Sequence, residues 1–362
     1  MLSIEEYNAS ERLATIGRSV PELMAFRPIT FQQVGYPTHV SLEGELARYV
    51  DHNFEAEVPG LFKPGAVFAP IGYVNEFTAD EKKLFDSVRD AVAAMTLRRF
   101  GRAIRPITNL LVQMGPYRVM DHLAKSFGTK QLAVFEVGPG LTYLGALLVQ
   151  AGHRYLSYDV TQSLYLWQNR LLAEVAGGDF VEMAMDPDPN RLMSGRVVHL
   201  PWWEYVKFLS GTEVRADIVY SNSNLGEMSR VALKHVLHIS RQMLAGSKLG
   251  LFMYFSTGMC AQNSPEVLAA EFEQFGYHKV FDSPFVAYVL NEDKGSVLTR
   301  VFNQDKASVL EKAFRHGVPL FDPSGNRARL TANEVMALRR AEAPLDVQLT
   351  CWNYGWTPPF ID

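Results

Sequence analysis

Cysteine is scarce in this chain, whose 362 residues include two, Cys260 and Cys351. Two cysteines exclude a disulfide framework and a cysteine-rich zinc site, and leave at most one bridge. Long apolar runs are also lacking, because the longest, 141–149 and 249–255, are far shorter than the roughly 20 residues of a membrane helix. The opening stretch, MLSIEEYNAS, has neither the basic nor the apolar block of a signal peptide. We therefore expect a cytoplasmic protein without a membrane segment.

An excess of one charge sign is missing as well, since 35 Lys and Arg face 39 Asp and Glu, for a formal net charge of -4. Nucleic-acid backbones demand a clustered basic excess, so no nucleic-acid partner is predicted. No His, Cys, Asp or Glu cluster has metal-ligand spacing, so no metal site is predicted either. One local basic group either holds a phosphate of an acceptor or forms a solvated helix end favoured by the helix dipole. This group consists of Arg98, Arg99, Arg102 and Arg105.

What the chain does have is a regular alternation of strands and helices from residue 131 onward, the mark of a doubly wound parallel sheet. The predicted fold class is therefore α/β, with a Rossmann-like doubly wound sheet. Two late strands lie so close together that they predict an antiparallel edge pair. The pattern predicts strands over 132–137, 155–158, 196–200, 217–220, 249–255, 279–281 and 285–290, and helices over 163–175 and 230–244.

Three regions follow from this reading. Residues 1–130 are expected to form a mainly helical cap or substrate region, and 131–298 the Rossmann-like domain. Residues 299–362 are expected to form an extension that packs on the core. Within the first region, the capping box of Thr78 and Glu81 starts a helix that should stop before Gly101. The next helix should break at Pro116.

The stretch LAVFEVGPGLTYLG, residues 132–145, is typical of a strand, a tight loop and a helix. Gly138 and Gly140 let the backbone approach a ligand where a Cβ would clash. Asp159 ends the next predicted strand, where a carboxylate can accept hydrogen bonds from ribose hydroxyls. Together they predict a cofactor that contains adenosine.

The spacing around these glycines decides between cofactors. A dinucleotide fingerprint needs glycine at its sixth position, which is Tyr143 here, so a nicotinamide oxidoreductase is the weaker alternative. A second alternative is a non-catalytic protein that keeps the same fold. With an acid two residues before the first glycine, the pattern resembles motif I of class I S-adenosylmethionine (SAM) methyltransferases. That resemblance implies SAM as cofactor, Asp159 at the ribose, and a loop around the methionine end made of Glu136, Gly138, Pro139, Gly140 and Thr142.

Ligands of open α/β sheets bind at the carboxyl ends of the strands, so the next two strand ends are further candidates. Trp202 or Trp203 can lay an indole on the adenine, or can pack in the core. Ser221 and Asn222 are predicted near the cofactor, with Asn222 at its amino-acid portion or at the acceptor. His199 lies inside a strand and is predicted to be a core histidine.

Methyl transfer to a hydroxyl needs aligned reactants and a group that removes the proton. In the polar turn SNSNLGEM, Glu227 is the predicted base and Asn224 the second catalytic candidate. Helix capping and loop hydrogen bonds are the alternative explanation of this turn. His235 and His238, on the following helix, are predicted to be structural.

A narrower resemblance covers about residues 132 to 255. The segments EVGPGLTYLGALL, YDVTQSLYLWQNRL and SNSNLGEM resemble a family of sugar O-methyltransferases of bacterial polysaccharide and glycoside pathways, chiefly through Tyr165, Gln168 and the pair Glu227-Met228. Pro139, Leu141 and Thr142 depart from the family pattern. The resemblance implies a small polar acceptor, a sugar or glycoside, with a non-sugar metabolite as the alternative.

Two further expectations concern partners. The tail carries Trp352, Tyr354 and Trp356, which either form a wall for stacking a sugar or clamp the tail onto the core. A homodimer is a possible assembly for the chain.

Overall fold

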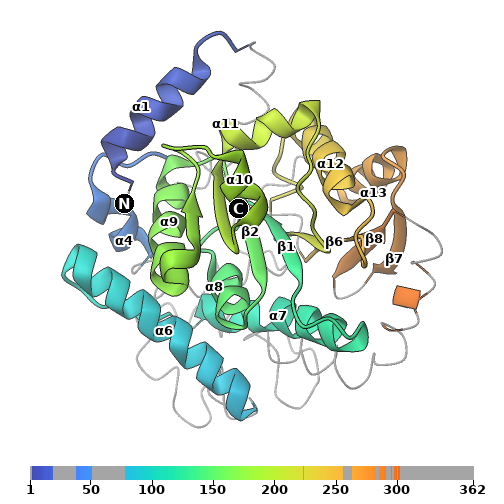
Figure 1. The fold of residues 1–362 in the computed structure, drawn as a ribbon, viewed down its shortest axis with the longest axis horizontal. Coiled ribbons are helices and arrows are strands. Elements are labelled where there is room, and N and C mark those ends of the chain that lie inside the picture. Colours follow the sequence, from blue (N-terminus) through green and yellow to red (C-terminus); the bar gives the residue numbers. More distant parts are fainter. Residues whose placement is uncertain are drawn as a thin grey trace, which may run out of the picture. The chain divides into compact units, whose positions relative to one another are not determined.

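Figure 1 shows the computed structural model of the protein. The described residues fall into two compact units, one with residues up to 43 and from 124 onward, the other with residues 44–123. The cysteines, the tail aromatics and nearly all of the expected extension lie outside the described residues, and the domain boundaries stay predictions. The structure describes residues 2–18, 38–50, 78–106, 108–222, 224–255, 263–282, 285–290, 295, 297–299 and 301.

The first unit is built on an eight-stranded sheet of order β3-β4-β2-β1-β5-β6-β8-β7. β3, β4, β2, β1, β5 and β6 are mutually parallel, whereas β8 runs antiparallel to both β6 and β7. The predicted Rossmann-like fold and its antiparallel edge pair are thereby confirmed (Figure 1). The strands are β1 (Ala133–Val137), β2 (Arg154–Asp159), β3 (Phe180–Glu182), β4 (Val197–Pro201), β5 (Ile218–Ser221), β6 (Leu251–Tyr254), β7 (His278–Asp282) and β8 (Val286–Val289).

Helices cover both faces of this sheet. Side chains alternate along β1, so Phe135 and Glu136 point to opposite faces. Phe135 stacks on Tyr205 of α11 with ring centroids 5.7 Å apart, and Glu136 contacts Tyr155, which packs beneath α8. The helices of this unit are α1 (Ile4–Thr15), α8 (Tyr143–Gln150), α9 (Gln162–Ala176), α10 (Pro189–Ser194), α11 (Trp202–Tyr205), α12 (Arg230–Leu244) and α13 (Pro265–Gln274).

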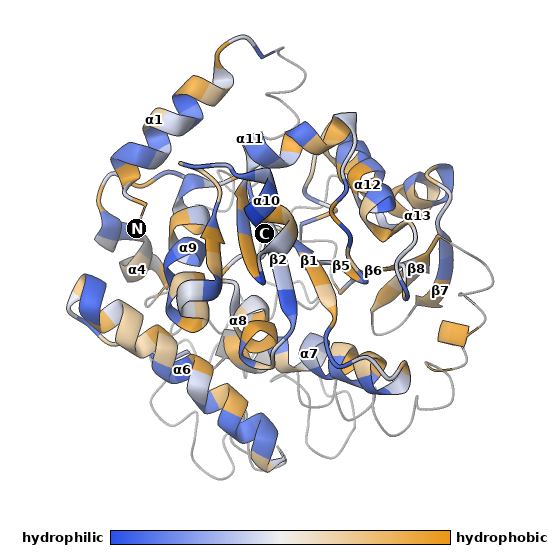
Figure 2. Ribbon diagram, in the orientation of Figure 1, coloured by the Kyte–Doolittle hydropathy of each residue, from blue (hydrophilic) through white to orange (hydrophobic). Residues whose placement is uncertain are grey.

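Helices α12 and α9 differ in how much of their surface is buried. α12 carries both hydrophobic and hydrophilic residues (Figure 2), and its buried positions recur at helical spacing because one face packs on the sheet. In α9, by contrast, every residue from Gln162 to Leu172 is buried. A buried helix is expected to be apolar, so the polar side chains of α9 must have partners inside the protein.

One strand escaped prediction. β3 pairs in parallel with β4 at the edge of the sheet and spans three residues. Three residues are too few to show the period-2 alternation by which a strand is recognised. The strand predicted third is therefore the fourth in the chain.

The second unit contains α6 (Ala79–Phe100) and most of α4 (Glu43–Val50) and α7 (Thr108–Ser126). The capping box of Thr78 and Glu81 is present, and α6 ends at Gly101 in the left-handed conformation, as predicted. Arg98 and Arg99 occupy its last turn, where a positive charge is favoured, and a phosphate-binding role for them stays a prediction.

The predicted break at Pro116 is wrong, because α7 continues through it. Proline removes one helical hydrogen bond. That loss is outweighed by burial on either side, at Met114 before the proline and at Val119 and Leu123 after it. No helix within the described ranges is long and apolar enough to cross a membrane.

Candidate active site

The sheet has its switch point between β1 and β5, because the chain passes from β1 to β2 on one side and reaches β5 on the other. Parallel strands place their carboxyl ends on one edge of the sheet. The loop after β1, Asp159, Trp202 and the turn after Ser221 therefore share that edge, as the sequence predicted. This edge is the candidate active site.

The loop after β1 has an unusual backbone. Gly138, Gly140 and Thr142 have φ angles of 60°, 57° and 56°, and Thr142 is the non-glycine residue with positive φ among those described. Its N–H closes a turn with the Pro139 carbonyl at 2.8 Å, and its hydroxyl lies 3.1 Å from the Tyr155 hydroxyl. A side chain in this conformation costs about 1–2 kcal/mol, which the surrounding hydrogen bonds must offset.

Substitutions at Thr142 are expected to separate this strain from the hydroxyl contact. Thr142→Gly relieves the strain and loses a hydrogen bond of about 1 kcal/mol, so the free energy of unfolding should hardly change. Thr142→Val keeps the strain and loses the same bond, and should cost about 1–2 kcal/mol. Urea unfolding measures both. Equal stabilities for the two variants would contradict the strained conformation.

Gly138 lies against a side chain from the other side of the switch point. A Cβ on Gly138 would lie 2.3 Å from Nδ2 of Asn224. That nitrogen donates to the Val137 carbonyl at 2.5 Å and to the Gly138 carbonyl at 3.1 Å, and the Ser221 hydroxyl donates to Oδ1 of Asn224. Asn224 thus fastens the turn after β5 to the loop after β1. A catalytic contact of Asn224 stays a prediction.

Asp159 is 3% exposed, and its carboxylate accepts hydrogen bonds from Thr161, from Gln168 and from the backbone of Val160. Its Oδ1 accepts from the N–H and the hydroxyl of Thr161 at 2.8 and 2.7 Å, and its Oδ2 accepts from Nε2 of Gln168 at 2.7 Å. Burial raises the pKa of Asp159, and the bonds from Thr161 and Gln168 offset part of that rise. A carboxylate has about four lone-pair sites, so a ligand donor would have to share a site with one of these groups or replace it.

Glu136 is buried beneath the loop. The Tyr155 hydroxyl donates to its Oε2 at 2.6 Å, and the same hydroxyl contacts Thr142. Burial raises the pKa of Glu136 to about 8, against the lowering effect of the Tyr155 bond, and the charge of Asp159 adds to the rise. In these contacts Glu136 supports the loop from below, and its contact with the methionine end of a cofactor stays a prediction.

Trp202 begins α11 at the end of β4. Its Nε1 donates to Oε1 of Glu11 at 2.9 Å, and the guanidinium of Arg18 lies 5.6 Å from the ring centroid. The indole of Trp203 meets it edge-on, at 87°. Arg18 therefore covers one face of the Trp202 ring. A contact between Trp202 and adenine stays a prediction, and it would have to use the other face of the ring.

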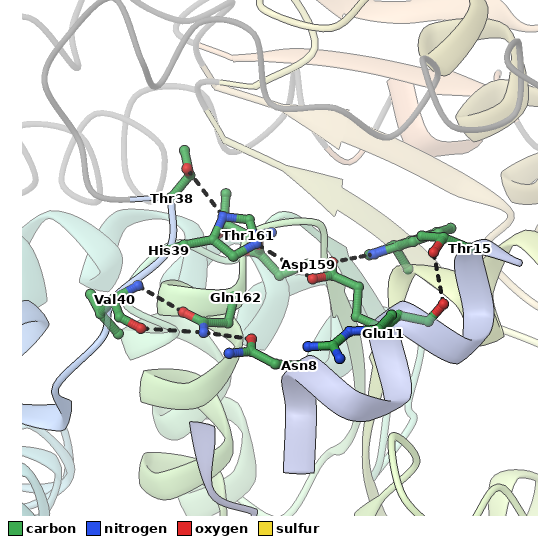
Figure 3. A network of polar contacts seen from close by, with 11 residues as sticks. Asn8, Glu11, Thr15, Thr38, His39, Val40, Asp159, Thr161 and Gln162 are labelled. Atoms are coloured by element: carbon green, nitrogen blue, oxygen red, sulfur yellow. Dashed lines mark hydrogen bonds and ion pairs between the residues drawn. The ribbon is translucent and has the colours of Figure 1, made fainter. Parts of the chain in front are cut away.

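Sequence reasoning did not foresee that α1 and residues 38–40 pack on the start of α9. Figure 3 shows Gln162 joined to Asn8 and Val40. Oδ1 of Asn8 accepts from Gln162 at 2.8 Å, the Val40 N–H donates to Gln162 at 2.9 Å, and His39 lies 3.4 Å from Glu11. The i, i+3 spacing of Asn8 and Glu11 on one helix face was the available signal.

The remaining predicted positions are His199 and the residues of the turn after β5. His199 is a core histidine, as predicted, with Nδ1 3.0 Å from the Ser157 hydroxyl and a pKa lowered to about 3 by burial. Glu227 follows Asn224 in a turn whose carbonyls at 225 and 228 accept from Asn263 at 3.2 and 2.8 Å. The roles of Glu227 and Asn222 stay predictions. Within the part of the chain that the structure describes, no group of three or more His, Cys, Asp or Glu could hold a metal.

Neither a protein-family model nor a curated protein matches the chain. Solved structures similar to it include a TehB-like SAM-dependent methyltransferase from Corynebacterium glutamicum, at 15% identity over 48% of this chain and 86% of that one, with TM-score 0.34. Magnesium protoporphyrin IX methyltransferase from Synechocystis, solved with bound SAM, matches at 12% identity over 59% and 96%, with TM-score 0.32. A glycopeptide N-methyltransferase matches at 11% over 49% and 90%, with TM-score 0.33. Likeness at this level concerns the fold, so function has to be inferred from the residues of the site.

Proposed function

We propose that the protein is a SAM-dependent O-methyltransferase. The observation that carries this proposal is the pairing, at the switch point, of a buried carboxylate on β2 with a left-handed glycine loop after β1. The antiparallel β8 between β6 and β7 supports it, since class I methyltransferases carry such an edge pair whereas dinucleotide-binding sheets are mostly parallel.

The residues present fit an adenosyl ligand. No heavy atom of the described residues lies within 4 Å of a Cβ built on Gly140, so the loop backbone is open to a ligand there. Asp159 ends β2 at the same edge of the sheet, where a ribose hydroxyl could share one of its carboxylate oxygens. In a dinucleotide fingerprint, the sixth glycine allows the helix to pack closely on the strand. In this protein Gly145 of α8 takes that role, where it packs against Tyr155 of β2. The loop therefore differs from a pyrophosphate loop in layout.

The acceptor side of the proposal rests on the turn after β5. When bound, SAM supplies an activated methyl group, and the protein has to align the acceptor and take its proton. Glu227 is the proposed base, and Asn222 and Asn224 the proposed polar contacts at the reaction centre. The resemblance of the segments around them favours a sugar or glycoside hydroxyl as acceptor. Incubation with candidate glycosides and SAM, followed by product mass, tests this class.

Asp159→Ala tests the cofactor. The change removes the proposed ribose acceptor and should weaken binding of S-adenosylhomocysteine by about 10- to 150-fold, the equivalent of a charge-assisted hydrogen bond worth about 1.5–3 kcal/mol. Isothermal titration calorimetry measures the affinity, and thermal shift with SAM, S-adenosylhomocysteine and NAD compares the ligands. Stabilisation by NAD alone would sink the proposal.

Asp217→Ala is the matched control. Its carboxylate also accepts a backbone hydrogen bond, from Ala133 at 3.0 Å, but it precedes β5 and lies at the opposite edge of the sheet. We expect this variant to lose stability while keeping the affinity of the unchanged protein. If both aspartate variants weaken the ligand equally, Asp159 has no special role at the ribose.

A further inference from the structure

Two parts of the site meet on one buried side chain of α9. Gln168 is 0% exposed, and its Nε2 donates to the Gly140 carbonyl and to Oδ2 of Asp159, both at 2.7 Å. Carbonyl and carboxylate oxygens accept only, so the amide nitrogen has to face them and the orientation of the side chain is unambiguous. Gln168 therefore spans the loop after β1 and the end of β2.

On the loop side, this bond fixes a peptide plane. The C=O and N–H of a trans peptide point in opposite directions, so a Gly140 carbonyl held toward α9 turns the Leu141 N–H away from α9. The neighbouring Trp167 acts in the same way, since its Nε1 donates to the Leu141 carbonyl at 3.3 Å. Two consecutive residues of α9 thus set the direction of the loop.

On the strand side, Gln168 supports a buried charge. It supplies the hydrogen bond that Oδ2 of Asp159 receives, while Thr161 serves Oδ1. A buried carboxylate oxygen that loses its donor pays a desolvation cost, and the carboxyl then protonates or rotates. Gln168 consequently favours the charged form of Asp159 and fixes the orientation of its carboxylate.

The amide oxygen of Gln168 shows that packing alone does not account for a glutamine at this position. Oε1 of Gln168 is buried, and no residue among those described gives it a hydrogen bond. An unsatisfied buried acceptor costs about 1–3 kcal/mol, which an apolar side chain of the same size would avoid. The two hydrogen bonds that Nε2 donates must therefore account for a glutamine at this position.

We propose that Gln168 is the positioning residue of the cofactor site, which holds the glycine loop and the ribose carboxylate in register with each other. It acts through Gly140 and Asp159 and does not itself have to touch the ligand. This inference rests on the proposed function, because the ligand concerned is SAM.

Gln168→Met, compared with Gln162→Met, tests the proposal. Gln162 lies on the same helix, is 1% exposed, and bonds Asn8 and Val40 instead of the site. Gln168→Met should weaken S-adenosylhomocysteine binding at least about tenfold in calorimetry, whereas Gln162→Met should lower the melting temperature and change the affinity less than about twofold. Equal changes in affinity would overturn the inference. Failure of the unchanged protein to bind would instead overturn the proposed function.

Gln168→Glu gives a second readout that a purely structural role would not move. The introduced carboxyl can donate to Asp159 while protonated, but repels it once both are ionised. Its S-adenosylhomocysteine dissociation constant should therefore rise with pH, by up to about tenfold per unit, between mildly acidic and neutral pH, because the pKa of Asp159 is itself raised by burial.

Burial raises the pKa values of Glu136 of β1, Tyr158 of β2 and Tyr7 of α1, and the charge of Asp159 adds to each rise. The unchanged protein contains these same groups, so its own pH profile is the baseline that the steeper Gln168→Glu profile has to exceed. If Gln168→Met does not fold, the Gln168→Glu profile decides alone, and a flat profile overturns the inference.

Discussion

Gly138→Ala is expected to lower the free energy of unfolding by about 2–5 kcal/mol, from two separate causes. A side chain at a φ of 60° costs about 1–2 kcal/mol. The new Cβ would also lie 2.3 Å from Nδ2 of Asn224, which must then leave the carbonyls of Val137 and Gly138. Overpacking of this kind costs about 1–3 kcal/mol. Urea unfolding followed by fluorescence measures the sum.

Gly140→Ala separates the two causes. Gly140 has nearly the same φ, 57°, and no described heavy atom lies within 4 Å of an added Cβ, so only the strain remains. Gly138→Ala should be the less stable variant by about 1–3 kcal/mol. Asn224→Ala should cost much less in the Gly138→Ala background than alone, because the bonds it removes are already broken. Identical stabilities for the two glycine variants would exclude the clash with Asn224.

Gly145→Ala should destabilise the protein by about 2 kcal/mol, because an overpacking cost of about 3 kcal/mol exceeds the gain of about 1 kcal/mol by which alanine is favoured over glycine in a helix. Its Cβ would lie 2.4 Å from Cζ and 2.6 Å from the hydroxyl of Tyr155. Tyr155 is fully buried and its hydroxyl is bonded to Glu136, so the ring has little room to move. Differential scanning calorimetry and urea unfolding both report the loss.

Gly178→Ala is the control for this substitution. Gly178 is exposed, its φ is not left-handed, and nothing described lies within 4 Å of an added Cβ. We expect a change within about 0.5 kcal/mol. If Gly145→Ala proves as mild as this control, helix α8 does not pack on β2 as closely as the structure indicates.

The elements that could be predicted from the sequence are those with a local signal. A β-branched strand, a glycine turn and a helix follow one another over 132–150, and Asp159 ends the next strand. Parallel pairing then brings these ends to one edge without further information. Local rules failed at Pro116, where burial on both sides outweighed one lost hydrogen bond, and at β3, which is too short to alternate.

The supports of the site could not be predicted, because they depend on contacts between distant residues. Asn224 bonds a carbonyl 87 positions earlier in the chain, and Gln162 bonds a side chain 154 positions earlier. Nothing in the letters SNSNLGEM distinguishes the amide that fastens a loop from one that faces a ligand. Gln168 stood out in the sequence through the family resemblance, but nothing local showed that its amide bonds the loop after β1 and Asp159.

The contacts of α1 also set an order of events during synthesis. Asn8 and Glu11 bond residues 154 and 191 positions later, in α9 and at Trp202. At about 5–20 residues per second, a ribosome needs about 10–40 s to deliver the last of these partners. Throughout that time the nascent α1 has no partner to pack on. Chaperones that shield exposed helices would therefore bind α1 before the sheet has formed.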